Sequence, residues 1–198
     1  MQSTRDRQSW FVKYGILALL ITMLITLVSC VGSNKTTVEN RDSRGAKILA
    51  TAQATIAGTS LAPAISGNIS LEETTAGLGM RGTFENVPAG MHGFHIHEGE
   101  SCAEEGKAAG GHFNPRGVVH GHLPSTGFEN AHAGDLGNLQ GSAKATTEWA
   151  LEISGLTLTP GEFSVANRPF IVHADPDDLS QPTGNAGARI ACGMITLQ

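Results

Sequence analysis

The strongest constraint on the fold is a succession of short segments rich in β-branched and small residues, which continues from Lys47 to the C-terminus. Turn signals separate the segments, and the clearest of them are residues 86–90 (NVPAG) and 159–162 (TPGE). Spacing of this kind predicts an antiparallel β-sandwich or barrel, with no convincing helix in this part of the chain. The segments are KILATAQATIAG, AISGNISLEE, GLGMRGTFENV, GMHGFHIHE, LQGSAKATTEWALEIS, EFSVANRPFIVHA and ARIACGMITLQ.

Composition supports this fold class and excludes others. The chain has 198 residues, which is room for one ordinary domain. Its 25 Gly residues and its charged fraction of 16% are unlike a helical bundle, and its 40% of hydrophobic residues is too high for a wholly disordered chain. The formal net charge of -5 provides no basic field, so we expect no nucleic-acid partner.

The first 29 residues are typical of an export signal. Arg5, Arg7 and Lys13 precede an apolar run of 14 residues, GILALLITMLITLV, which is shorter than the roughly 20 residues of a membrane-spanning helix. The run ends in LVSC, which resembles the lipobox of bacterial lipoproteins, where cleavage precedes a cysteine that is then acylated. We therefore predict a lipid anchor at Cys30, on the periplasmic or cell-surface face of a bacterial membrane. A plain signal peptide or an uncleaved amphiphilic anchor is the alternative, and in each case the folded part leaves the cytosol.

The polar stretch that follows, VGSNKTTVENRDSRG, has no periodic apolar pattern and predicts a flexible tether. The predicted organisation is a signal peptide at residues 1–29, a tether at 30–45 and one folded domain at 46–198. Loss of residues 1–29 removes three of the 13 basic residues and one of the 18 acidic residues, which leaves a formal charge of -7. An anionic substrate would consequently need a local source of positive potential.

Cysteine usage fits an exported protein. With Cys30 assigned to the lipid, Cys102 and Cys192 remain as an even pair, for which a disulfide is the default outside the cytosol. The bond would close about 90 residues of chain, and the chain-entropy model gives such a loop roughly 4–5 kcal/mol. The sequence has no C-x-x-C motif, which favours a structural bond over a redox-active one.

Eight His residues in a chain of this size point to a metal site, and two of them lie at i and i+2 in FHIH. On a strand, His95 and His97 would point to the same face, where one metal ion could contact both. His173 lies on a later strand, in FIVHA, and is free to join this pair. An all-imidazole site of this kind favours copper.

A second set of donors lies in the first of two long loops, which span residues 99–134 and 175–188. Long loops on a rigid sheet commonly carry function. Spacings of 8, 12 and 3 residues separate three imidazoles and one carboxylate, a set that suits tetrahedral zinc. These donors are His112, His120, His132 and Asp135.

Four motifs, in order along the chain, closely resemble those of the copper/zinc superoxide dismutase family: GFHIHE, GGHFNP, HAGDLGN and GNAGARIACG. The resemblance covers residues 47–198, and the segment HEGESCAEEGKAAGGHFNP is most similar to the bacterial branch. It implies a Greek-key antiparallel β-sandwich, or flattened eight-stranded barrel, with two long functional loops. It also implies an exported enzyme that converts superoxide to dioxygen and hydrogen peroxide.

The resemblance assigns a role to each donor. His112 would bridge the two metals as an imidazolate and hand a proton to the forming peroxide, while zinc holds the ring and has no redox role. The implied ligands are His95, His97, His112 and His173 for copper, and His112, His120, His132 and Asp135 for zinc.

Two further roles follow from the resemblance. Arg189 would sit beside the copper and attract the anionic substrate, because a guanidinium is permanently charged and presents a fixed fork of donors. Asp177 would join His97 and His120 by hydrogen bonds, with Asp178 as an adjacent candidate for the same role.

Other conspicuous residues receive non-catalytic interpretations. His92 would tie loops to the sheet, His122 would be an exposed loop histidine, and Trp149 would serve packing or a subunit surface. The short loop DLSQPTG lacks charged residues apart from its first Asp, so Lys107 or Arg116 would have to supplement the arginine beside the copper in steering superoxide.

Two other functions stay open at this point. A copper-binding or metallochaperone-like module of the same fold would lack dismutase activity, and a surface lipoprotein could use its histidines merely to buffer zinc. The resemblance also admits a homodimer. Copper and zinc content, measured together with superoxide removal, separates the enzyme from the other two.

Overall fold

The computed structural model describes residues 40–142 and 146–198. The predicted signal peptide, Cys30 and residues 30–39 of the predicted tether lie outside the described residues. Within the described ranges, no helix is both long enough and apolar enough to cross a membrane.

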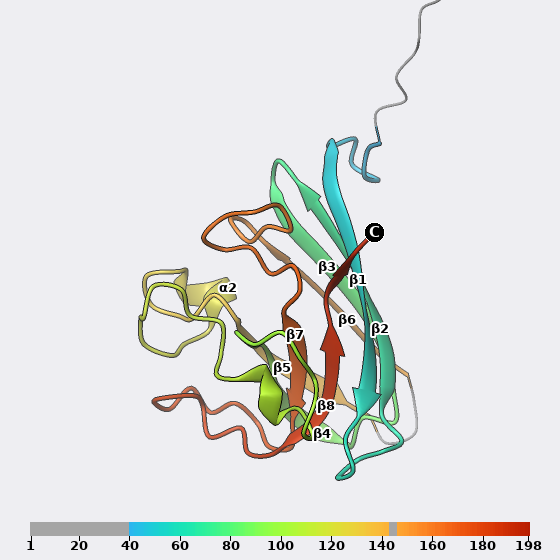
Figure 1. Cartoon of the computed structure of the whole chain (residues 1–198), viewed down its shortest axis with the longest axis vertical. Coiled ribbons are helices and arrows are strands. Elements are labelled where there is room, and N and C mark those ends of the chain that lie inside the picture. The colour runs from blue at the N-terminus through green and yellow to red at the C-terminus, as the bar shows by residue number, and fades with distance from the viewer. Residues whose placement is uncertain (1–39, 143–145) are drawn as a thin grey trace, which may run out of the picture. The chain divides into compact units, whose positions relative to one another are not determined.

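The described residues form one antiparallel sheet that curls into a nearly closed barrel, so the predicted all-β fold is confirmed (Figure 1). The order along the sheet is β5-β4-β7-β8-β1-β2-β3-β6, and β9 pairs with β1 outside this path. Neighbours that are not consecutive, such as β3 with β6 and β8 with β1, give the Greek-key topology. The strands are β1 (Ile48–Gly58), β2 (Ser66–Thr74), β3 (Gly77–Glu85), β4 (Gly90–Ile96), β5 (Asp135–Gly141), β6 (Thr147–Ile153), β7 (Pro169–His173), β8 (Arg189–Met194) and β9 (Thr196–Leu197).

Alternation of side chains explains why these segments are strands. Along β2 and β3, buried residues alternate with more exposed ones, which is the pattern of a sheet with one face on a core. The core has an aromatic centre, where the ring of Phe94 meets Phe84 edge-on at 5.7 Å and stacks on Phe170 at 5.3 Å. Trp149 packs edge-on against the Phe94 ring at 5.0 Å, in agreement with the packing interpretation.

Three adjacent strands, β4, β7 and β8, position the histidine region. His95 pairs with Ile171 across β4 and β7, and His173 at the end of β7 pairs with Arg189 at the start of β8. In Figure 1 the two long loops, coloured yellow-green and orange-red, lie on one side of the barrel, and β1, β2 and β3 form the other side. Helical structure in the described residues is limited to two short turns in the first long loop, η1 (Lys107–Ala109) and α2 (Leu123–Thr126).

Candidate metal centre

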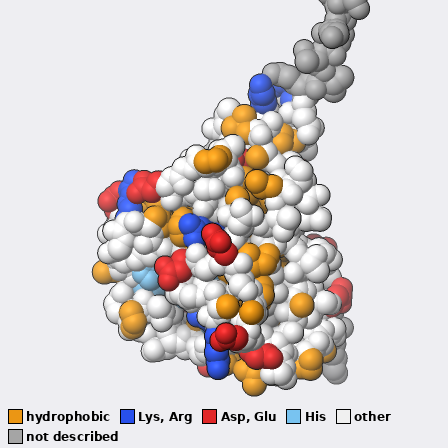
Figure 2. All heavy atoms as spheres, viewed as in Figure 1, with side chains coloured by type: hydrophobic (Ala, Val, Ile, Leu, Met, Phe, Trp, Pro, Cys, Tyr) orange, Lys and Arg blue, Asp and Glu red, His pale blue; other side chains and the backbone are white. Residues whose placement is uncertain are grey.

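The structure brings seven of the predicted donor residues together in two groups of four that share one member. Within each group the donor atoms all lie within 4.8 Å of one another, and every residue is buried. On the face of the molecule in Figure 2, histidine accordingly reaches the surface only as a small area. The first group is His95, His97, His112 and His173, and the second is His112, His120, His132 and Asp135.

Strands β4 and β7 hold most of the first group. His95 and the residue just beyond β4, His97, alternate with the core residue Ile96, as the i, i+2 spacing predicts for a strand. His173 ends β7, and its Nε2 lies 3.3 Å from Nε2 of His97. His112 enters from the first long loop, where an isolated β-bridge pairs its backbone with that of His97. Two strands and one loop bridge therefore converge on the first group.

Asp135 organises the second group. Its Oδ1 lies 2.8 Å from Nδ1 of His112 and 3.1 Å from Nδ1 of His132, and its Oδ2 lies 2.9 Å from Nδ1 of His120. The same Oδ2 accepts the backbone N–H groups of Gly121 and His132. Burial opposes the charged form, but these contacts outweigh it and hold the pKa of Asp135 well below its usual range. The second group thus contains an anionic oxygen donor.

Burial keeps three imidazoles of the centre neutral. Desolvation, with nearby histidines acting in the same direction, lowers the pKa of His97 to about 2 and that of His173 to about 3. The pKa of His112 falls to about 4, because desolvation outweighs its contact with Asp135. Desolvation also acts on His120, but two neighbouring carboxylates outweigh it and raise the pKa of that ring to about 9. Neutral imidazole is the form that binds a metal ion.

Among residues 40–142 and 146–198, two buried ring nitrogens have no hydrogen-bond partner, namely Nδ1 of His95 and Nδ1 of His120. The second is close to a carboxylate oxygen of Asp135 but lacks hydrogen-bond geometry. A buried polar atom without a partner is costly, and a bound cation would remove the cost at each position. Four imidazoles suit copper, and three imidazoles with one carboxylate suit zinc. The residues present therefore fit the two metals.

Asp177 joins the two donor groups by contacts with His95 and His120. The predicted partner His120 is confirmed, but the predicted partner His97 is wrong, because His95 takes its place. Oδ2 of Asp177 lies 2.8 Å from Nε2 of His95, and its Oδ1 lies 3.0 Å from Nε2 of His120. The second long loop returns over β4 at Gly93, whose N–H donates to a carbonyl of that loop. This return places the carboxylate beside His95, while Nδ1 of His97 faces a carbonyl of the first loop at 3.0 Å.

An open cavity of about 390 Å³ gives access to the first group. His97, His112 and His173 line it together with Arg189. The guanidinium of Arg189 donates hydrogen bonds to three backbone carbonyls of the segment 106–110. These bonds fix a permanent positive charge at the cavity, which is where an anionic substrate would need it.

The predicted disulfide between Cys102 and Cys192 is present, with the two Cα atoms 5.8 Å apart. It ties the first long loop to β8, three residues beyond Arg189. The hydrogen bonds of Arg189 hold the same loop a few residues further along the chain. The segment between the two attachments is thereby held against the sheet beside the cavity.

Two histidines lie outside both groups. The ring nitrogens of His92 lie 2.9 Å from the carbonyl oxygen of His173 and 3.0 Å from that of Pro88, so this ring ties backbone segments together. His122 precedes α2, and its Nδ1 lies 2.6 Å from Oγ of Ser125. Neither His92 nor His122 is a member of either donor group.

The two candidates for additional steering charge differ in their surroundings. Arg116 pairs with Glu129 at 2.6 Å and with Glu162 at 2.8 Å, so its charge is neutralised locally. Lys107 begins η1 and is exposed, and its backbone carbonyl accepts a hydrogen bond from Arg189, which lines the cavity. Of the two candidates, Lys107 is the one whose main chain contacts Arg189.

Two residues of the second long loop belong to the centre although the sequence did not predict them. Gly184 has a φ of +75°, and a Cβ there would overlap Oδ1 of Asp177 and lie 2.7 Å from Nε2 of His120. Gln181 contacts the backbone of His120. Gly184 begins the motif GNAG, in which a glycine can indicate close backbone approach. Gln181 is a single amide in a loop, and nothing in the sequence distinguishes it from other polar loop residues. Asp178, the alternative to Asp177, is exposed.

Comparison with known proteins agrees with this geometry. A family model described as copper/zinc superoxide dismutase matches residues 65–195. An extracellular superoxide dismutase [Cu-Zn] of Haemonchus contortus is 40% identical over 136 residues, which cover 65% of this chain and 72% of that protein. One of Caenorhabditis elegans is 37% identical over 136 residues, which cover 65% of this chain but only 60% of that protein. The crystal structure of the clock protein EA4 matches with a TM-score of 0.66 and 30% identity, over 75% of this chain and 95% of that one.

Proposed function

This chain belongs to the copper/zinc superoxide dismutase family, and on that premise we propose that it converts superoxide to dioxygen and hydrogen peroxide outside the cytosol. One observation carries the proposal: two four-donor groups share His112 and lie beside a cavity that also contains Arg189. A metal-binding module needs the donors alone. A dismutase also needs access to the metal and a positive group for the anion, and this chain has both.

We assign the first group to copper and the second to zinc, because the carboxylate is found only in the second. Copper would supply the one-electron chemistry of the reaction, and zinc, which has no redox role, would hold the shared ring. The proposed copper ligands are His95, His97, His112 and His173, and the proposed zinc ligands are His112, His120, His132 and Asp135.

The shared imidazole is placed to carry a proton on one of its nitrogens. Nδ1 of His112 faces Asp135, so Nε2 lies on the opposite side of the ring, toward the first group. Because His112 also lines the cavity, a proton on Nε2 would lie next to a bound substrate. Asp177 holds one ring nitrogen of His95 and one of His120, which orients both rings.

Arg189 places a positive charge at the cavity of a domain whose formal net charge is negative. Its carbonyl partners at residues 106–110 hold the guanidinium at the cavity, where it would attract superoxide and orient it by its fork of donors. Lys107 lies in the segment that Arg189 holds and would extend this potential outward.

Copper and zinc content, measured together with superoxide removal, tests the proposed function. We expect about one copper and one zinc per chain, since each four-donor group suits one ion, and superoxide removal that stops when a chelator extracts the copper. Stable binding of both metals without superoxide removal would overturn the proposal. Labile copper without zinc would instead support a copper-binding or metallochaperone-like module.

We further propose that residues 1–29 are a lipoprotein signal, that Cys30 is acylated, and that residues 30–45 tether the domain 46–198 to a bacterial membrane. The sequence LVSC supports the acylation, and the disulfide supports an oxidising compartment. Fatty-acid labelling should mark the unaltered protein and fail to mark Cys30→Ala. An unlabelled protein with a free N-terminus after residue 29 would contradict the anchor.

Two finer points complete the proposal. The segment of residues 97–115 supports a place in the bacterial branch of the family. The family resemblance admits both a monomer and a homodimer, and sedimentation equilibrium of the purified protein distinguishes them, since a homodimer gives twice the mass of one chain. A mass equal to one chain at all concentrations would contradict the dimer.

A further inference from the structure

The second long loop holds the backbone of one predicted metal ligand by a side-chain amide. Oε1 of Gln181 accepts the backbone N–H of His120 at 3.0 Å, and Nε2 of Gln181 donates to the backbone carbonyl of His120 at 2.9 Å. One amide group therefore satisfies both hydrogen-bonding groups of the His120 main chain, across 61 residues of sequence.

His120 has no neighbouring strand that could provide these bonds. It lies within residues 117–122, which form neither helix nor strand, and the residue is nevertheless buried. Buried backbone groups need partners, because each unsatisfied one costs a lost hydrogen bond. The amide of Gln181 provides the two hydrogen bonds that a neighbouring strand would otherwise form with the His120 backbone.

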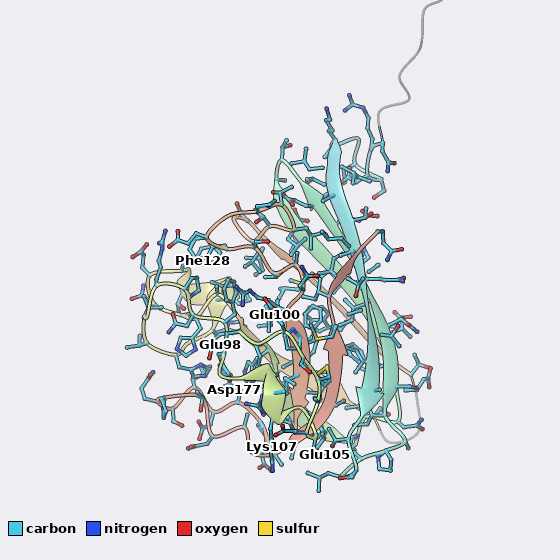
Figure 3. The ribbon with its side chains drawn as sticks, viewed as in Figure 1. Glu98, Glu100, Glu105, Lys107, Phe128 and Asp177 are labelled. Carbon is cyan, nitrogen blue, oxygen red and sulfur yellow. A yellow bond between two sulfur atoms is a disulfide. The ribbon has the colours of Figure 1, made fainter. Side chains whose placement is uncertain are left out.

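The same loop also holds the ring of His120. Oδ1 of Asp177 lies 3.0 Å from Nε2 of the ring and also accepts the backbone N–H of Leu179 at 2.8 Å. Figure 3 shows Asp177 on the side of the molecule where the two long loops lie. His120 is thus held at two points, its ring by Asp177 and its main chain by Gln181. Nδ1 of His120 is left for the second group, close to Asp135.

We propose that Gln181 is a positioning residue that fixes His120 and thereby the zinc-binding geometry, an inference that rests on the proposed function. Its effect should be selective between the metals. Two ligands of the first group are held without Gln181. Nδ1 of His97 contacts the backbone carbonyl of residue 110, and Nδ1 of His173 contacts that of residue 187. Loss of the amide should therefore loosen zinc more than copper.

Two variants and one matched control test the inference in the full chain. Gln181→Met keeps the length of the side chain and removes both hydrogen bonds. Gln181→Glu keeps an oxygen toward the His120 N–H but turns a second oxygen toward the His120 carbonyl. The control is Gln140→Met, because the amide of Gln140 on β5 also donates to backbone carbonyls, those of Gly90 and Gly141, yet contacts neither group.

The first readout is the transfer of zinc from the metal-loaded protein to a chromogenic chelator. We expect transfer to be roughly tenfold faster in both Gln181 variants, which is the usual effect of removing a contact behind a ligand. Copper release should change by less than about twofold, and Gln140→Met should match the unaltered protein in both measurements. Equal zinc transfer in all four proteins would overturn the inference alone, and an unaltered protein that holds no zinc would overturn it together with the proposed function.

The second readout uses the metal-free protein and separates positioning from general stability. Amide hydrogen exchange at His120 should be faster in Gln181→Met and remain protected in Gln181→Glu, which keeps an acceptor for that N–H. Gln181→Met leaves two buried backbone groups of His120 without their partner, so its thermal unfolding midpoint should fall. Positioning is then shown by a loss of zinc that exceeds the loss of copper. If both metals were lost equally and the unfolding midpoint fell in parallel, Gln181 would be a structural residue and the inference would be overturned.

Discussion

The guanidinium of Arg168 stacks on the ring of Phe113, with its Cζ 3.8 Å from the ring centroid. The same side chain donates to the backbone carbonyl of Glu98 at 2.7 Å. These two partners directly follow His112 and His97, whose backbones form a β-bridge. A single cation therefore braces the two chain segments that bring His97 and His112 into the first donor group.

The variant Arg168→Gln should destabilise the protein. It removes a half-buried cation–π contact and a charged hydrogen bond, for which we expect a loss of about 2 kcal/mol in the free energy of unfolding. Calorimetry should show a melting temperature lower by roughly 4–8 °C for a domain of this size. The control is Arg116→Gln, whose guanidinium lies 4.7 Å from the ring of Phe163 but pairs with exposed carboxylates, and it should cost less than about 1 kcal/mol. Equal losses in the two variants would contradict the bracing role.

The variant Gly184→Ala should disrupt the contact between Asp177 and His120. The new Cβ would overlap the carboxylate, and the φ of +75° is unfavourable for any L side chain. Gly117→Ala is the matched control, because its φ is +62° and a Cβ there meets nothing within 4 Å, so it carries only a backbone cost of about 1 kcal/mol. We expect reduced zinc content in the first variant and normal zinc content in the second. Similar zinc content in both would show that the overlap is relieved without moving Asp177.

The metal-free protein should lose stability in acid. The folded-state pKa values of His97, His112 and His173 are about 2, about 4 and about 3, whereas the ordinary value is 6.5. Below pH 6.5 the unfolded chain therefore binds more protons than the folded chain, and stability falls as the pH drops toward the folded values. The raised pKa of His120 changes stability only between about pH 6.5 and 9, and its contribution is fully present below pH 6.5, so it does not oppose the loss in acid. Urea unfolding of chelator-treated protein between pH 7.5 and 4 checks this, and a midpoint that rises in acid would contradict it.

The variant Lys107→Gln should slow the capture of superoxide without altering metal content. The backbone carbonyl of Lys107 contacts Arg189, which lines the cavity, and loss of the nearby Lys107 charge weakens the local positive potential. We expect kcat/KM to fall by a factor of about 2 at low ionic strength and the difference to shrink as salt screens the field. Arg116→Gln again serves as the control, since it removes an equal charge that two carboxylates already neutralise. The same salt dependence in both variants would refute the steering role of Lys107.

Local sequence signals were sufficient to predict the fold class. Short β-rich segments separated by turn signals predicted an antiparallel sandwich or barrel, and the structure has a nearly closed antiparallel barrel. The i, i+2 spacing of His95 and His97 predicted neighbouring donors because strand side chains repeat every two residues, and the structure brings them into one group. The pairing of Cys102 with Cys192 followed from cysteine number and export, and the bond is present.

The path of the loops was beyond such signals. Asp177 meets His95 and not His97 because the second long loop folds back over Gly93, which no periodic pattern in the sequence encodes. The contact between Gln181 and the backbone of His120 could not be predicted either. Any side-chain amide that lies close to a backbone N–H and C=O can form these hydrogen bonds, so no residue type at either position signals them. Contacts that depend on where two irregular segments meet require the folded structure.

A ring that belongs to both donor groups has a thermodynamic consequence. If each group binds one ion, the ions cannot bind independently, because each changes the charge and the freedom of the imidazole of His112 that the other needs. Thermodynamic linkage then requires the effect to be reciprocal. The factor by which an ion in the first group changes the affinity of the second group equals the factor by which an ion in the second group changes the affinity of the first.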